Sequence, residues 1–210
     1  MKRRSVLAGL VAAVSCPAWG QDAMMGVDLN SPKMTTAEMS RDDVIALIKT
    51  GGPVNLSGKR LSGLDLSALD LTAANFRGAY LNKANLKGSK LDSAVLDQVW
   101  GLSANFEGAT LITASLIASQ MRGANFSGAN LTGTRITADL TGSNFSGARF
   151  NGADLSADMK NQSMGLMRAV LRSSRLQGAD FTDANLSRTV FEFAVMKDTN
   201  LQGANLFGAE

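Results

Sequence analysis

Large apolar residues recur at every fifth position through most of the chain after residue 54. The series begins with Leu56, Leu61, Leu66, Leu71, Phe76, Leu81, Leu86, Leu91 and Leu96. On an α-helix a step of five residues turns the side chain by about 140° net, which would scatter the series around the helix. On a straight strand successive members would alternate between two faces. The period therefore predicts a solenoid, in which the chain turns at each unit and the apolar residues face one axis.

The residues between these apolar positions also repeat. An alanine stands two residues before most members of the series, with Asn or Asp between them, as in Ala124-Asn125-Phe126. Positions two apart share one face of an extended chain, so the alanine should point inward where little space remains beside the bulky residue. Ser, Thr, Lys or Gly usually follow, which is typical of tight turns with a solvated outer face.

The repeated unit Ala-Asn/Asp-Leu/Phe-x-Gly, as in Ala124-Asn125-Phe126-Ser127-Gly128, resembles the pentapeptide-repeat family. Many units in one phase make this resemblance far more specific than a single match would be. The resemblance implies an all-β fold, a right-handed quadrilateral β-helix over residues 54–209 with four repeats per turn. Coils of this kind would stack roughly 4.8 Å apart and hydrogen-bond to their neighbours.

The two ends of such a solenoid expose unpaired edges that invite association. Ser40-Arg41-Asp42-Asp43 and the apolar residues after it predict an N-capped amphipathic helix over residues 40–52, which should cap the first coil. No comparable segment follows Leu206 and Phe207. We expect this end to form a homodimer by isologous pairing, the alternative being a frayed last coil in a monomer.

Apolar residues at outward positions predict an interaction patch near the C-terminal end. Val190, Phe193 and Val195 are its members. The five-residue phase also breaks at Gly101, slips after Ile136 and Leu155, and is lost over residues 161–167. Such breaks correspond either to surface loops that confer specificity or to neutral wear of the repeat.

The N-terminus has the features of a secretory leader. Basic residues precede an apolar stretch over residues 6–14, and Ala18 and Gly20 are small residues at the positions a signal peptidase inspects. We predict a signal peptide over 1–20, a flexible segment over 21–39, and export from a bacterial cytoplasm to the periplasm or medium. Arg3-Arg4 resembles a twin-arginine signal, so the choice between that route and the general one stays open.

The single cysteine, Cys16, lies inside the predicted leader. The mature chain would therefore form no internal disulfide, and lipidation at Cys16 stays a less favoured alternative because the preceding residues match a lipoprotein box weakly. No later apolar stretch is long enough to predict an integral membrane segment.

Charge argues against nucleic acid as a partner. The chain has 21 basic and 18 acidic residues, and removing Lys2, Arg3 and Arg4 with the leader makes the two equal. A neutral protein has no long-range field to attract a polyanion or to imitate one.

The sequence predicts no catalytic residues, cofactor or metal site. The chain contains no histidine, which removes the commonest general base and metal ligand. Met159, Met164 and Met167 are soft ligands that suit copper(I), but methionine more often fills irregular packing. We therefore expect a protein that is not an enzyme.

Three functions follow from the resemblance and the leader. We favour a rigid scaffold in the cell envelope that binds an unidentified protein partner. The alternative from another class is a structural envelope protein whose rods associate with one another. A minor alternative is suggested by relatives that imitate DNA and bind type II topoisomerases, although that role requires an acidic rod in the cytosol.

Overall fold

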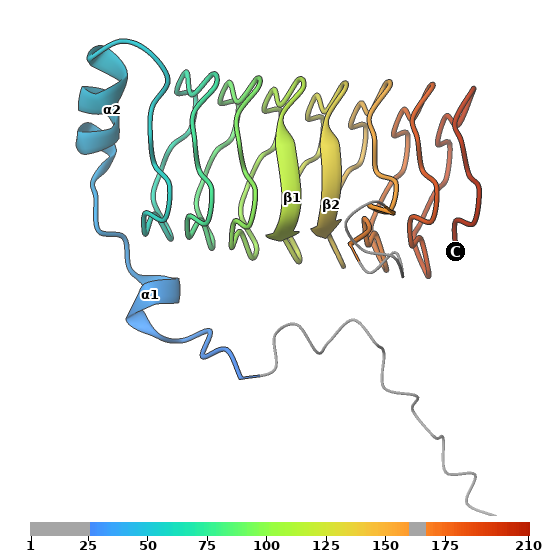
Figure 1. Cartoon of the computed structure of the whole chain (residues 1–210), viewed down its shortest axis with the longest axis horizontal. Helices are drawn as coiled ribbons and strands as arrows, with labels where there is room; N and C mark the ends of the chain where they lie inside the picture. Colours follow the sequence, from blue (N-terminus) through green and yellow to red (C-terminus); the bar gives the residue numbers. More distant parts are fainter. Residues whose placement is uncertain (1–25, 160–166) are drawn as a thin grey trace, which may run out of the picture.

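The computed structural model describes residues 26–159 and 167–210 of the chain. Two short helices, α1 (Pro32–Thr35) and α2 (Arg41–Lys49), precede a stack of coils that contains the strands β1 (Ser115–Gln120) and β2 (Arg135–Asp139). Figure 1 shows the coils side by side along one axis, with α2 at the first coil and the C-terminus at the last. The predicted leader, its cleavage point and Cys16 lie outside the described residues.

Parallel pairing between coils fixes the size of each turn. β1 pairs with β2 in parallel, and isolated bridges join residues twenty apart, as in Asn55↔Asn75 and Tyr80↔Trp100. Twenty residues hold four five-residue units, so each coil has four sides. We name these sides by their first inward residue: side A begins at Leu56, side B at Leu61, side C at Leu66 and side D at Leu71.

Most corners between two sides are β-turns. At the first corner the Leu56 carbonyl accepts from the Lys59 amide, and Gly58 has a φ of 68°. A positive φ at the third residue is what a type II turn requires, which explains the recurrent glycine. The asparagine before the apolar residue braces the same corner, because Asn55 Oδ1 accepts from the Ser57 amide at 3.1 Å. The repeat is therefore a turn motif as well as a core motif.

Some corners lack this asparagine or aspartate. The backbone amide of the corner then donates to a side chain of the previous coil. Trp100 cannot accept the Leu102 amide, and Asn82 Oδ1 accepts it at 2.9 Å. Asp97 Oδ1 accepts the Ile117 amide in the same way. The polar groups of the turns therefore remain paired where the repeat departs from its consensus.

The core is a column of apolar side chains along the axis. The inward leucines, phenylalanines and alanines of the inner coils are buried. Phe106, Phe126 and Phe145 stack in consecutive coils of side C, with ring centroids 4.7 and 4.9 Å apart. The stacking changes to side D at Phe150, whose ring lies over that of Phe181 at 4.4 Å.

Two irregularities interrupt the stack. The bridge Asn125↔Asn144 spans nineteen positions, so the slip after Ile136 shortens one coil by a residue, and β2 carries the pairing through it. The second irregularity follows Leu155. The Asp158 amide donates to the Met167 carbonyl at 2.9 Å and closes the base of this excursion. Residues 160–166, which include Met164, lie outside the described residues.

Helix α2 contacts the first coil. Ser40 and Asp43 form a capping box at its N-terminus, and Val44 is fully buried in the core. The Arg41 guanidinium donates to the Asp65 carbonyl and the Ser67 carbonyl, both at 2.9 Å. These carbonyls lie on the edge of the first coil, which no earlier coil among the described residues covers.

The described part of the segment expected to be flexible, residues 26–39, lies along side B, and we call it the N-terminal arm. Met34 is 6% exposed, and its carbonyl accepts from Asn82 Nδ2 at 3.0 Å. The Glu38 amide donates to the Arg60 carbonyl, and the Lys33 ammonium lies over the Tyr80 ring, 5.1 Å from its centroid. These contacts join the arm to two successive coils.

Candidate interaction surfaces

The C-terminal coil exposes its inward residues. Leu171, Leu176, Phe181 and Leu186 of the preceding coil are fully buried. Their counterparts one coil later, Phe191, Met196, Leu201 and Leu206, are only partly buried, and Leu206 is 44% exposed. Within the described residues no further coil covers this end, so apolar side chains and the edge of the coil face solvent together.

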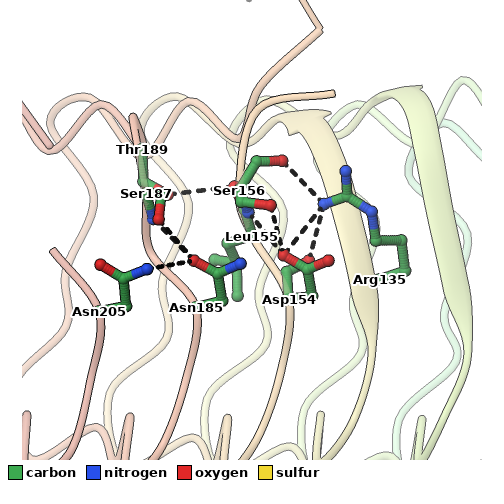
Figure 2. A network of polar contacts seen from close by, with 8 residues as sticks. All are labelled: Arg135, Asp154, Leu155, Ser156, Asn185, Ser187, Thr189 and Asn205. Carbon is green, nitrogen blue, oxygen red and sulfur yellow. Dashed lines mark hydrogen bonds and ion pairs between the residues drawn. The ribbon is translucent and has the colours of Figure 1, made fainter. Parts of the chain in front are cut away.

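Phe207 projects from the corner that follows Leu206 and is 72% exposed. Its amide donates to Asn205 Oδ1 at 3.1 Å, so the corner that carries the ring is braced. Figure 2 shows the polar column on the same side of the coil stack, in which Asn205 Nδ2 donates to Asn185 Oδ1 and Asp154 lies beside Arg135. The two predicted dimer residues therefore stand at the end of an ordered side A.

The predicted interaction patch is smaller than expected. Phe193 is 76% exposed and Val195 is 48% exposed, as their outward positions predict. The prediction was wrong for Val190, which is only 3% exposed. Val190 pairs with Val170 of one neighbouring coil, and the Thr189 carbonyl accepts from the Glu210 amide of the other. The ion pair between Arg168 and Glu210 also crosses its coil, so neighbours on both sides cover Val190.

Phe193 occupies an unfavourable backbone conformation. Its φ is 59°, in the left-handed region, at the corner position that glycine fills in many coils. The other non-glycine residues in this conformation are alanine, serine, threonine, lysine, glutamine, arginine or aspartate. An aromatic L-residue with positive φ is an outlier, and such strain concentrates at functional sites. Phe193 thus has both a strained backbone and an exposed ring, and neither feature stabilises the folded protein.

Ion pairs join adjacent coils on the outer surface. Arg77 pairs with Asp97 at 3.0 Å, Lys87 with Glu107 at 3.0 Å, and Lys90 with Asp70 at 3.5 Å, each joining residues twenty apart. Each of these pairs places a positive side chain beside a negative one on the coil stack.

Hydrogen bonds favour the ionised form of two surface carboxylates on the coils, Asp180 and Asp70. Hydrogen bonds from Thr182 and Asn151 lower the pKa of Asp180 below 3.8 despite some desolvation, and hydrogen bonds from Thr72 do the same for Asp70. A general acid near neutral pH requires the opposite shift. Among the described residues no group of three or more acidic residues or cysteines is arranged to hold a metal ion.

In the described part of the chain, no helix has the length and apolar character needed to cross a membrane. Met159 is 47% exposed beside the excursion, while Met164 lies outside the described residues, so the copper-ligand hypothesis stays untested.

A family model described as pentapeptide repeats matches the chain in eight copies, over residues 54–98, 103–137, 136–156 and 174–210. Among solved structures, HetL of the cyanobacterium Nostoc sp. strain PCC 7120, involved in heterocyst differentiation regulation, shares 21% identity. It matches over 82% of this chain and 95% of its own, with a TM-score of 0.45.

QnrB1, a plasmid-mediated fluoroquinolone resistance protein, shares 18% identity over 75% of this chain and 91% of its own, with a TM-score of 0.40. A pentapeptide repeat protein of the Arabidopsis thaliana thylakoid lumen shares 30% identity over 68% of this chain and 77% of its own, with a TM-score of 0.19. No protein of curated function matches this sequence.

Proposed function

The chain belongs to the pentapeptide-repeat family of right-handed β-helices, whose members are generally non-enzymatic structural or interaction proteins, and from this premise we propose that it is an exported scaffold binding another protein in the cell envelope. Its partner surface is the corner formed by Phe193 and Val195. The rigid coil stack presents this corner with little loss of backbone conformational entropy on binding. Helix α2 caps the opposite end through Val44 and Arg41.

Phe193 is the observation that supports this proposal. Its ring is more exposed than any other large apolar side chain in the described residues, and it stands on a strained turn. Aromatic side chains contribute much of the energy at protein interfaces. Val195 extends the same surface on side C, where Asn85, Asn105, Asn125 and Asn144 occupy the equivalent place in inner coils. An apolar residue therefore replaces a polar column next to the strained ring.

The test is crosslinking in cells that express the tagged full-length protein, followed by mass spectrometry of the co-purified material. The scaffold proposal expects a stoichiometric foreign protein that Phe193→Asp removes and that Lys197→Gln, a change on the same coil, retains. The N-terminal peptide should begin at Gln21, which reports export separately. Self-crosslinks alone would exclude the scaffold role.

The open coil favours a second candidate, a structural protein that associates through its C-terminal end. Leu206 and Phe207 would pair with the same residues of a second copy, and both edges would be covered at once. Light scattering of the purified protein distinguishes the cases. A homodimer that Phe207→Asp converts to monomer supports end-to-end pairing, whereas a monomer at all concentrations excludes it.

A further inference from the structure

A cavity of about 340 Å³ lies between the N-terminal arm and the corner where side B turns into side C. The arm supplies Leu29 and Met34 to one wall. Three successive coils form the other wall, which contains Gly63 of the first, Asn82 and Lys83 of the second, and Leu102 and Ser103 of the third. A volume of this size falls at the lower end of the range found for small-molecule sites, about 300–1,000 Å³.

Asn82 joins the two walls. It is 8% exposed, its Nδ2 donates to the Met34 carbonyl at 3.0 Å, and its Oδ1 accepts from the Leu102 amide at 2.9 Å. One buried amide therefore fixes the arm and the corner relative to each other. Met34 is itself buried on the arm side of this bond. The cavity is thus formed before any ligand enters, which lowers the entropic cost of binding.

The arm is held on both sides of Met34. Glu38 forms ion pairs with Lys59 at 3.4 Å and with Arg60 at 3.2 Å, and its amide donates to the Arg60 carbonyl at 2.9 Å. Lys33 lies over the Tyr80 ring. These contacts keep the arm in place without occupying the cavity, so the space beside Leu29 and Leu102 is not filled by the side chains that anchor it.

The wall combines an apolar floor with one free cation. Leu29, Met34 and Leu102 supply the apolar part. Lys83 stands exposed on the corner with a φ of 57°, and it makes no ion pair among residues 26–159 and 167–210. No Asp or Glu is among the described residues that line the cavity, and Glu38 of the arm pairs with Lys59 and Arg60. An anion entering the cavity would meet the Lys83 ammonium with no carboxylate in the described part of the wall.

We propose that this cavity binds a small amphiphilic anion. A short alkyl chain lies against Leu29, Met34 and Leu102, and a carboxylate at its end meets the Lys83 ammonium and the Ser103 hydroxyl. The site lies at the opposite end of the coil stack from Phe193, so it does not depend on the proposed scaffold role.

Titration calorimetry of the full-length protein with butanoate, hexanoate and octanoate tests the chain-binding part. Affinity should rise about fourfold per added methylene while the chain stays on the apolar wall. Octanol, which has the same tail without the charge, should bind roughly fivefold more weakly than octanoate. Acetate should show no saturable binding, because it carries the head group alone.

Two variants locate the site. Lys83→Gln should bind octanoate and octanol equally, while Lys197→Gln, which removes an exposed lysine from the last coil, should preserve the wild-type difference. Leu102→Ser should weaken octanoate by about tenfold. Amide signals of Asn82, Lys83 and Leu102 should shift on titration in nuclear magnetic resonance spectra, which also show that the variants remain folded.

Three results would each overturn the proposal. Octanoate that fails to bind saturably up to about 10 mM leaves no site of useful affinity. Affinity independent of chain length contradicts the apolar wall. Binding that Lys83→Gln and Leu102→Ser leave unchanged, or signal shifts confined to other coils, would place the ligand elsewhere.

Discussion

Met121 fills the place in the core that Gly101 leaves empty. The two residues occupy the same inward column of side B in successive coils, where the repeat otherwise carries a large apolar side chain. A Cβ built on Gly101 would overlap the Met121 sulfur. Methionine is unbranched and flexible, so its side chain can turn into the neighbouring coil. The break in the repeat at Gly101 is therefore compensated one coil later.

This pairing predicts strong coupling between the two positions. Gly101→Leu restores the consensus residue but should destabilise the protein by about 1–3 kcal/mol through overpacking against Met121. Met121→Ala should cost about 2–5 kcal/mol through the cavity it leaves. The double variant should lose much less than the sum, because the new leucine fills that cavity. Urea unfolding of the four proteins measures the coupling, and additive losses would contradict the assignment.

Phe193→Gly should stabilise the isolated protein. Glycine adopts a positive φ without the penalty of about 1–2 kcal/mol that an L-side chain incurs, and the exposed ring makes little packing contribution. Thermal unfolding should show an increase of about 1 kcal/mol in stability, reduced by the backbone entropy that glycine loses on folding.

Phe193→Ala is the matched control for this prediction. It removes the ring but keeps the Cβ in the left-handed conformation, so its stability should stay near that of the wild type. An equal gain from alanine and glycine would show that removal of the exposed ring, and not the backbone, is responsible.

The architecture follows from the sequence because each five-residue unit repeats both a core environment and a turn. Leu71 and Phe126 lie inward as their positions in the series predict. The residues around each inward position are of the same kinds in most coils. The five-residue pattern is therefore sufficient to predict which residues are buried. The pairing of positions twenty apart does not follow from the five-residue period alone; only the resemblance to the pentapeptide-repeat family implied it, and the bridges between coils confirm it.

Features that depend on contacts between different coils could not be predicted in this way. Val190 occupies an outward position, but Val170 and Glu210 in the adjacent coils cover it. Residues 26–39 carry no five-residue period, and the bond between Asn82 and Met34 joins residues 48 positions apart. The cavity beside the arm therefore had no signal in the sequence, whereas the exposure of Phe193 and Phe207 did.

Acid should release the N-terminal arm and α2 before the coils unfold. Desolvation raises the pKa of Glu38, but hydrogen bonds and charges from Lys59 and Arg60 bring it below 4.5. Hydrogen bonds from Ser40 bring the pKa of Asp43 below 3.8. Both values lie below those of the unfolded chain, so the unfolded state binds more protons. The stabilisation that these two carboxylates provide is fully present above their pKa values in the unfolded chain. It is lost as the pH falls through their lower pKa values in the folded protein.

Hydrogen exchange measured at decreasing pH, and corrected for the intrinsic rate, checks this order. Protection of residues 26–49 should fall below pH 4.5 while that of the central coils persists. Asp43→Asn should weaken protection of α2 already at neutral pH, whereas Asp42→Asn leaves the capping box intact and should retain it. Simultaneous loss of protection in the arm and the coils would refute a separate acid-sensitive unit.

The asparagine column of side C should stabilise the coil stack more than the corner bonds alone. Asn105 Nδ2 donates to Asn85 Oδ1 at 3.2 Å, and its Oδ1 accepts from Asn125 Nδ2 and from the Glu107 amide, both at 3.1 Å. Asn55 accepts only the corner amide of Ser57 among the side-chain bonds of the described residues. Replacing Asn105 therefore removes two bonds between coils that Asn55 does not make.

Asn105→Ala should cost about 2 kcal/mol and Asn55→Ala less than about 1 kcal/mol, at about 0.5–1.5 kcal/mol per hydrogen bond. Bonds in such a row polarise one another, so Asn85→Ala combined with Asn105→Ala should lose less than the sum of the single changes. Urea unfolding of the four variants under one set of conditions provides the comparison. Equal losses for Asn105→Ala and Asn55→Ala would mean that the amides between coils contribute nothing beyond what water offers, and that the asparagines serve the turns alone.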